Sequence, residues 1–299
     1  MLRTLVRMYA ALLVRGRLWD GGAVPLVAGR YGPEDGPALP LTVLGDSSAL
    51  TVGVLEGRHT NGARLAEDLV AESGCAVDLD VPARAGVTTA GMARQVAAVA
   101  ARGERGVALI LIGGNDVMLP VPLRRSAARL GHYVRVLRAS GWEVVVGACA
   151  DIGAAPALRR AARGPASRRS RALARRQTAA ALGAGAVVVS LTAEEFRRRP
   201  EDLYCPDGFH PNAAGYLLYE KRALVAVAAA GRVAAGTRRE LDGRPDAVFP
   251  DEWEAARNVT SEPGACFIPA QAGGPVSLHR YRPRRDVPAP GPALVPTAS

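Results

Sequence analysis

Residues Leu41–Gly53 read LTVLGDSSALTVG, an apolar run that stops abruptly at a glycine. The run is typical of a short buried strand, and Gly45, Asp46 and Ser47 follow it directly. A serine at such a point is either an ordinary turn residue or a nucleophile. The local sequence does not separate the two, so the rest of the chain has to supply the partners that a nucleophile needs.

From residue 41 onward, strand-like and helix-like segments alternate. Strands are predicted over 41–45, 75–81, 107–114, 143–149 and 186–191. Helices are predicted over 61–74, 88–103, 124–139, 157–182 and 212–231, the fourth with a break near Gly164 and Pro165. The alternation predicts βαβ units and a mostly parallel sheet covered on both faces, which is an α/β fold. Ligands of such sheets bind at the carboxyl ends of the strands.

Composition divides the chain into three parts. The chain has 299 residues, 48% of them hydrophobic, enough for one large core. We expect a basic N-terminal segment over 1–40, a catalytic domain over 41–245 and a Pro/Arg-rich tail over 246–299 that is disordered or loosely attached. The net charge is +10, but Lys221 is the only lysine, so the excess reflects a general bias toward arginine more than an anionic partner.

The N-terminal segment has the pattern of a basic amphipathic helix. Arginines at positions 3, 7, 15 and 17 alternate with apolar residues, and the run Met8–Val14 is too short to span a bilayer. Residues 1–20 therefore predict peripheral membrane contact, with a helix packed on the domain as the alternative. No small-residue cleavage site follows the run, which favours a cytoplasmic or membrane-surface location, with export as the alternative.

Three further loops carry residues that a serine nucleophile would use. Gly86 follows the second predicted strand, Asn115 follows the third, and Asp207 and His210 lie just before the last helix. Each feature taken alone is common in turns. Their joint occurrence, in one α/β chain and at predicted loops, favours a single site.

The chemistry that needs these residue types is acyl transfer. A serine hydroxyl is a weak nucleophile until a base takes its proton, and imidazole does this near neutral pH. His210 would serve as that base for Ser47, and Asp207 would hold the other ring nitrogen and stabilise the imidazolium. The backbone N–H groups of Ser47 and Gly86 and the side-chain amide of Asn115 would stabilise the oxyanion.

In these residues the chain resembles the SGNH hydrolases, also called the GDSL esterase/lipase family, and in detail its actinobacterial-type members. The resemblance covers about 41–231 and rests on Gly45-Asp46-Ser47, on Gly86, on Gly113-Gly114-Asn115-Asp116 and on Asp207-Gly208-Phe209-His210-Pro211. It implies a three-layer αβα sandwich with a five-stranded parallel sheet, similar to flavodoxin. It also implies metal-independent hydrolysis of acyl or acetyl esters of small molecules or lipids, without a cofactor. Ser48 stands where the family name has leucine, a position without a chemical role.

Two other functions compete with a serine esterase. An acyltransferase of the same fold would pass the acyl group to a sugar or envelope acceptor instead of water. A non-catalytic basic module would bind an anionic membrane surface. The arginine-rich run 157–176 supports such binding, but a solvated helix face explains it as well, and the run carries no aromatic residue for base stacking, so no nucleic acid is expected. An α/β-hydrolase is disfavoured because Ala49 breaks the Gly-x-Ser-x-Gly pattern.

The four cysteines and the remaining acidic residues receive structural interpretations. The cysteines show no CxxC spacing, so no metal site is expected and free thiols are favoured over a disulfide: Cys75, Cys149, Cys205 and Cys266. Asp46 and Asp116 are expected to organise their loops by accepting hydrogen bonds. Asp151 follows the fourth predicted strand and is a reserve candidate for shaping the pocket.

Overall fold

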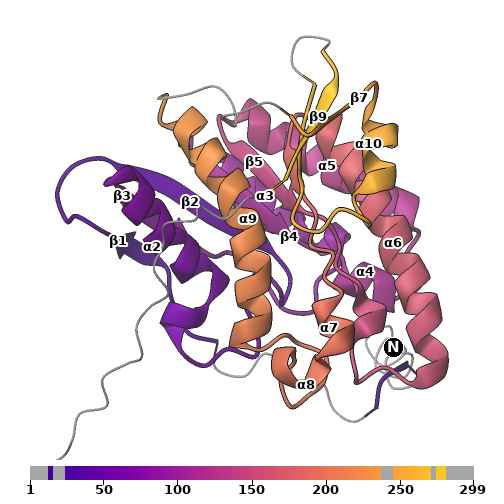
Figure 1. Cartoon of the computed structure of the whole chain (residues 1–299). Helices are drawn as coiled ribbons and strands as arrows, with labels where there is room; N and C mark the ends of the chain where they lie inside the picture. Colours follow the sequence, from indigo (N-terminus) through magenta and orange to yellow (C-terminus); the bar gives the residue numbers. More distant parts are fainter. Residues whose placement is uncertain (1–12, 16–23, 237–244, 271–273, 281–299) are drawn as a thin grey trace, which may run out of the picture.

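A single mixed sheet with helices on both faces makes up the fold (Figure 1). The structure is a computed structural model that describes residues 13–15, 24–236, 245–270 and 274–280. Nine strands lie in the order β1-β3-β2-β4-β5-β6-β8-β9-β7. The α/β class is confirmed.

The centre of the sheet is parallel, as the βαβ pattern predicts. Its strands are β3 (Ala76–Asp80), β2 (Ala38–Gly45), β4 (Val107–Leu111), β5 (Glu143–Gly147) and β6 (Val187–Val189). Gly45 pairs with Leu111, and Leu111 pairs with Gly147, so β2, β4 and β5 end at the same level. The loops that follow these strands therefore start side by side.

Helices on the two faces of the sheet bury separate apolar cores. One face is covered by α2 (Asn61–Ser73) and α9 (Ala213–Ala234). The other is covered by α3 (Ala93–Ala100), α5 (Leu123–Ala139), α6 (Arg160–Leu182) and α10 (Glu252–Asn258). The central strands send alternate side chains into the two cores, so Leu109 faces one and Ile110 the other.

Short elements at the carboxyl edge of the sheet connect the strands to these helices. They are η1 (Gly57–His59), η2 (Thr89–Met92), α4 (Gly114–Met118), η3 (Ile152–Ala154), α7 (Glu195–Arg198) and α8 (Pro200–Leu203). Side chains fix several helix starts. The Thr60 hydroxyl accepts from the N–H of Ala63 at the start of α2, and the Asn212 side chain accepts from Ala214 and Gly215 at the start of α9.

The sheet is larger than the expected five parallel strands. Strand β1 (Gly29–Tyr31) adds antiparallel to β3 at one edge. At the other edge, β8 (Cys266–Ile268), β9 (Val276–His279) and β7 (Ala247–Phe249) add antiparallel beyond β6.

The expectation of a disordered tail from residue 246 is therefore wrong for its described part. Phe267 of β8 is fully buried in the core, and Ala255 of α10 packs there too. Strand β8 pairs with the edge of β6, and this pairing orders a segment whose proline- and glycine-rich sequence does not predict regular structure. The rest of the expected tail, 281–299, lies outside the described residues, as do 271–273.

Two other predictions concern helix α6 and the N-terminal segment. The predicted break at Gly164 and Pro165 does not occur, because α6 continues through both residues. Of the predicted amphipathic segment 1–20, only 13–15 are described. There Val14 is buried and forms an isolated bridge with Leu158. Within the described residues, no helix combines the length and the apolar character needed to cross a bilayer.

Candidate active site

Ser47 lies in a tight turn directly after β2. The Gly45 backbone has φ +143°, and a side chain there would overlap the main-chain carbonyl of Leu111. The buried Gln95 amide holds this glycine from both sides, because it accepts from the Gly45 N–H at 2.9 Å and donates to the Gly45 carbonyl at 3.0 Å. The N–H of Val52 donates to the Ser47 carbonyl at 2.9 Å, which closes the turn. Ser47 is thus half-buried on a rigid turn at the carboxyl edge of the sheet.

Asp207 and His210 form a buried pair on the loop before α9. The Nδ1 atom of His210 lies 2.7 Å from Oδ2 of Asp207, and the side chains are 8% and 6% exposed. The other carboxylate oxygen accepts from the backbone N–H groups of Phe209 and His210, at 2.9 and 3.0 Å. Burial alone would raise the pKa of Asp207, but the hydrogen bonds from the His210 ring and from these N–H groups lower it to about 2. Asp207 is therefore an ionised carboxylate fixed against one nitrogen of the imidazole.

The Ser47 turn and the His210 loop pack against each other. A Cβ at Gly53 would lie 3.5 Å from Cβ of His210 and would overlap Sγ of Cys205. Burial raises the pKa of the Cys205 thiol to about 11, so it stays protonated and donates to the Gly53 carbonyl at 3.2 Å. The hydroxyl of Tyr216 donates to the carbonyl of Val52 at 3.1 Å from the first turns of α9. The two segments are in contact, although no hydrogen bond joins the Ser47 hydroxyl to His210 within the described residues.

Asn115 and Gly86 lie on the two neighbouring loops. The Asn115 side-chain amide donates to the carbonyl of Val87 at 2.9 Å and lies 3.5 Å from Oδ2 of Asp46. Asn115 therefore links the loop after β4 to the loops after β3 and β2. Gly86 has φ +77°, is exposed, and has no atom within 4 Å of the position that a Cβ would take, so its backbone borders open space.

Asp46 organises the nucleophile turn, as the sequence predicts. Its Oδ1 accepts from the backbone N–H of Ser48 at 2.9 Å. Burial raises the pKa of Asp46 to about 6, and the charge of Asp116 adds to the increase. Hydrogen bonds from the N–H groups of Ser48 and Gly113 partly offset the increase. Asp46 thus links the Ser47 turn to the loop after β4, which carries Asn115.

The Asp116 side chain links the segment that follows Gly86 to helix α5. The carboxylate is fully buried and accepts from the N–H of Thr89 at 2.9 Å, from its hydroxyl at 3.2 Å, and from the hydroxyl of Ser126. Sequence reasoning missed Thr89, Ser126 and Gln95, because each stands in an ordinary helical or turn pattern. Their role arises only where buried polar groups meet between loops.

Asp151, His59 and His132 lie outside this group of loops. Asp151 caps η3 by accepting from the N–H of Gly153 at 3.0 Å and forms an ion pair with Arg197. His59 is 3.8 Å from a carboxylate oxygen of Glu56, and His132 is exposed on α5. Among the described residues, no three His, Cys, Asp or Glu side chains gather as a metal site would require, and all four cysteines are free thiols.

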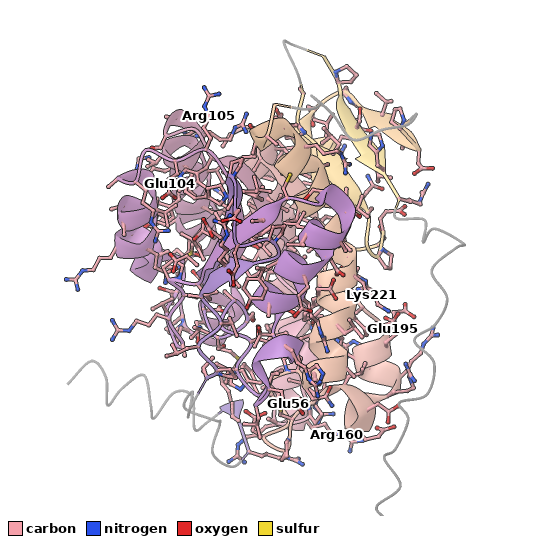
Figure 2. All side chains as sticks on the ribbon, turned by 90° about the vertical axis from the view of Figure 1, so that its left-hand side faces the viewer. Glu56, Glu104, Arg105, Arg160, Glu195 and Lys221 are labelled. Carbon is pink, nitrogen blue, oxygen red and sulfur yellow. The ribbon has the colours of Figure 1, made fainter. Side chains whose placement is uncertain are left out.

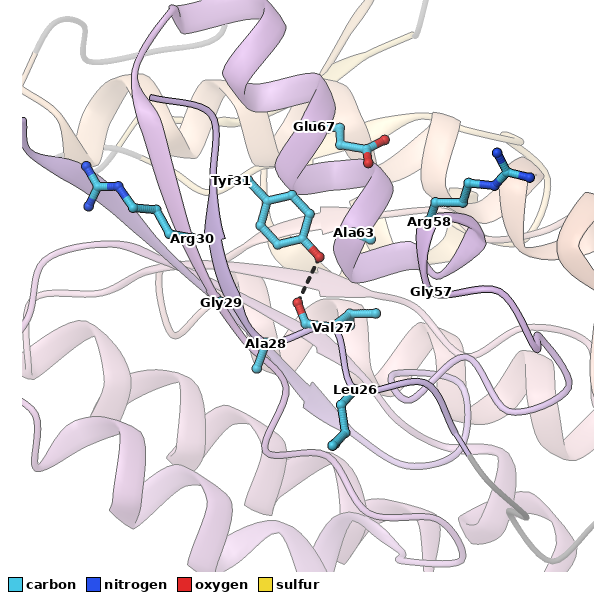
Figure 3. Close-up of a pocket in the computed structure, with 10 residues that line it drawn as sticks. All are labelled: Leu26, Val27, Ala28, Gly29, Arg30, Tyr31, Gly57, Arg58, Ala63 and Glu67. Carbon is cyan, nitrogen blue, oxygen red and sulfur yellow. Dashed lines mark hydrogen bonds between the residues drawn. The ribbon is translucent and has the colours of Figure 1, made fainter. Parts of the chain in front are cut away.

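The surface of the described residues includes two hollows, one of which borders the candidate site. One, of about 330 Å³, lies between Tyr31, Arg58 and Glu67 and contains none of the five predicted site residues (Figure 3). The other, of about 480 Å³, is lined by Pro156, Pro200 and Tyr204 together with the residues that flank Asp207. The second hollow therefore borders the Asp207–His210 loop, whereas the first has no contact with the candidate site.

Comparison with known proteins places the site residues within a matched region. The sequence profile of the GDSL-like lipase/acylhydrolase family matches residues 43–218. The chain is 33% identical over 255 residues to a Mycobacterium tuberculosis protein named GDSL-like esterase Rv1075c, and this alignment covers 84% of the chain and 77% of the relative.

The solved structures that match the chain are more distant in sequence. The crystal structure of TesA has a TM-score of 0.48 at 21% identity and covers 62% of this chain and 97% of its own. A member of the lipolytic G-D-S-L family from Veillonella parvula DSM 2008 has a TM-score of 0.49 at 17% identity, with coverage of 62% and 97%.

Proposed function

The chain belongs to the GDSL-like lipase/acylhydrolase family and is a carboxylic ester hydrolase, and from this premise we propose that Ser47, His210 and Asp207 are its catalytic triad. The observation that carries the proposal is the buried Asp207–His210 pair, packed against the turn that holds Ser47. A carboxylate fixed on Nδ1 directs the ring so that the other nitrogen is the one available to a substrate or a hydroxyl.

The proposed reaction has two halves. In the first, Ser47 Oγ attacks the ester carbonyl carbon while Nε2 of His210 takes the hydroxyl proton. The tetrahedral intermediate collapses, the C–O bond to the alcohol breaks, and the imidazolium gives its proton to the leaving alkoxide. In the second, His210 takes a proton from water, the hydroxide attacks the acyl-serine, and Ser47 leaves with the proton as the carboxylic acid is released.

Asp207 suits this cycle because its charge is permanent near neutral pH. With its pKa held at about 2, it stays ionised while the histidine gains and loses a proton. An ionised partner stabilises the imidazolium that forms in each half-reaction. The carboxylate also fixes the ring orientation, so little reorganisation accompanies proton transfer.

The oxyanion would be stabilised by donors from three loops. The backbone N–H groups of Ser47 and Gly86 and the amide of Asn115 are the proposed donors, and the hydrogen bonds to Val87 and Asp46 orient that amide. The open space next to Gly86 leaves room for a substrate oxygen. Donors held in this way before the reaction stabilise the transition state more than mobile ones do.

The test is labelling with a fluorophosphonate probe followed by peptide mapping. We expect one modified residue, Ser47, and no labelling after Ser47→Ala. The neighbouring Ser48→Ala variant is the matched control, because it removes a hydroxyl from the same turn and should keep the label. Labelling that survives Ser47→Ala, or that maps to another residue, would refute the assignment.

An acyltransferase would share every step up to the acyl-enzyme. Hydrolysis is proposed here because the family and the named relative are esterases. Product analysis with a short acyl ester, with and without a sugar acceptor, separates the two. Free acid as the main product in both reactions supports hydrolysis, and an acylated sugar would support transfer.

A further inference from the structure

Helices α5 and α6 lie side by side, and their exposed face carries no acidic side chain. Every exposed position of α6 is arginine, alanine, glycine or proline, and α5 adds only arginine, alanine and one histidine. Five of the exposed arginines on these two helices form what we call the arginine face: Arg124, Arg125, Arg160, Arg168 and Arg171.

An inward-pointing arginine shows how the two helices are aligned. The Arg169 guanidinium donates to the main-chain carbonyls of Val117, Leu119 and Val121, which lead into α5. Gly131 of α5 likewise lies against Ala180 of α6, so the two helices run in the same direction and the first turn of α5 lies level with the middle of α6, near residues 171–175. The same guanidinium donates to the carbonyl of Asp116, so the arginine face lies directly behind the block that carries Asn115.

The stretch of sequence that carries this face contains few acidic residues. Between residues 117 and 193 the only acidic residues are Glu143 and Asp151, and both are paired, with Arg138 and Arg197. The acidic residues of α10 lie at the far end of α6, where Glu252 approaches Gly183. A general bias toward arginine explains why these residues are not lysines, but it does not explain the absence of acids.

The positions of these arginines destabilise helices α5 and α6. Arg168 and Arg171 are three residues apart on α6, and like charges at this spacing repel. Arg124, Arg125 and Arg160 lie in first turns that contain no acidic residue, next to the positive end of each helix dipole. An anion bound outside this face would offset the repulsion.

We infer that the arginine face docks onto an anionic phospholipid surface and holds the carboxyl edge of the sheet beside it. Helix α6 begins just after the carboxyl end of β5, and Arg160 lies at the same end of the molecule as Glu56, which follows the Ser47 turn (Figure 2). An enzyme docked in this way would act on esters presented in or near the membrane. That substrate class rests on the proposed function, whereas the docking itself does not.

A lipid surface fits the face better than a nucleic acid does. Its exposed residues include no Phe, Tyr or Trp on which single-stranded bases could stack. An array of phosphate headgroups requires only dispersed positive charge, with attraction growing for each arginine near the surface.

The test is co-sedimentation of the full chain with vesicles of phosphatidylglycerol and phosphatidylcholine, compared with phosphatidylcholine alone. We expect binding only to the anionic vesicles and its loss at high salt. Combined Arg125→Glu, Arg168→Glu and Arg171→Glu should weaken binding by about 100-fold or more, because each arginine near an anionic surface contributes separately.

A matched variant separates this face from net charge. Arg58→Glu, Arg198→Glu and Arg257→Glu change the net charge equally, at exposed arginines that each pair with a nearby acid. This control should keep its vesicle affinity within a few-fold. Equal loss in both variants would overturn the inference, as would equal binding to neutral vesicles. Tighter binding to a DNA duplex than to anionic vesicles at the same salt would overturn the lipid assignment.

Activity on a soluble ester distinguishes a failure of the docking proposal from a failure of the proposed esterase function. The face variant should hydrolyse a soluble short-chain p-nitrophenyl ester at the wild-type rate, and its melting temperature reports whether it folds. Loss of vesicle binding with full soluble activity supports docking alone. Full vesicle binding without any serine labelling would refute the proposed function and leave docking intact.

Discussion

The Asp207 carboxylate lies 2.7 Å from Nδ1 of His210, and both side chains are almost fully buried. Three hydrogen bonds converge on this one carboxylate, two of them from the backbone of the same loop. These three hydrogen bonds all come from residues of the same loop. The role of this pair can therefore be tested by a single substitution at Asp207.

Replacing Asp207 with asparagine removes the charge and keeps the shape. We expect Asp207→Asn to lower kcat for a soluble ester by up to about 10⁴-fold, since a neutral amide does not stabilise the imidazolium. KM should change little. Steady-state kinetics with thermal melting check this, and a folded Asn variant with wild-type kcat would argue against the triad.

Asn115 provides a test of the oxyanion donors. Asn115→Ala should reduce kcat by about 10²–10³-fold with little change in KM, because the lost hydrogen bond is strongest in the transition state. The amide also holds the Val87 carbonyl, so the melting temperature has to be measured as well. A folded Asn115→Ala variant with wild-type kcat would contradict an oxyanion role.

Gly53 tests the contact between the Ser47 turn and the His210 loop. Its φ is +104°, and a methyl group there would overlap Sγ of Cys205. Gly53→Ala should therefore lower both the free energy of unfolding and kcat. Gly74→Ala is the control, because φ is +69° but the space is empty, so strain alone should cost about 1–2 kcal/mol and leave kcat unchanged. Equal effects of the two variants would mean that the contact does not position His210.

The raised pKa of Glu220 predicts that the free energy of unfolding depends on pH, independently of catalysis. This buried side chain of α9 has its pKa raised from 4.5 to about 8, by burial and by a hydrogen bond and charge repulsion from Asp68 of α2, with Arg64 and Lys221 opposing the increase. The folded state then holds a proton that the unfolded state releases near pH 4.5. Its stabilising contribution is complete below that pH and is lost as the pH rises toward 8.

Urea unfolding across this range measures the effect. The free energy of unfolding should fall between about pH 5 and 8, by at most about 1.4 kcal/mol per pH unit from this group. Glu220→Gln keeps a hydrogen-bonding side chain without a titrating proton, so its stability should vary less with pH. Parallel curves for wild type and variant would show that Glu220 does not titrate in this range.

The parallel core could be predicted from the sequence because most of its strands are apolar runs that alternate with helical patterns. The run 107–111, for example, lies between two helical patterns and is followed by Ile112 and two glycines. Strands β7, β8 and β9 were missed because each has only three or four residues in a segment rich in proline and glycine. Their order comes from pairing beyond β6, which no local pattern encodes.

The expected break in α6 has a similar explanation. Pro165 lies in the second turn of the helix, where it removes a single main-chain hydrogen bond. Packing along the rest of α6, including buried Leu173 and Leu182, outweighs that loss. Local propensity predicted an interruption that tertiary contacts override.

The site was predictable only where its residues stand in motifs. Ser47, Asn115 and His210 have recognisable neighbours in the sequence, so they could be proposed as partners. Gln95 stands in an ordinary helical pattern 50 residues from the glycine that it holds. The two hydrogen bonds between the Gln95 amide and the Gly45 main chain can be recognised only in the folded structure.

The pairing of β8 with β6 has a practical consequence for anyone shortening this protein. A chain cut at residue 245, where the periodic pattern fades, would leave β6 as a bare, apolar edge and remove Phe267 from the interior. Exposed edges of this kind recruit other chains, so the trimmed protein should precipitate or self-associate. Residues up to His279 therefore belong in any minimal version made for crystallisation or assay.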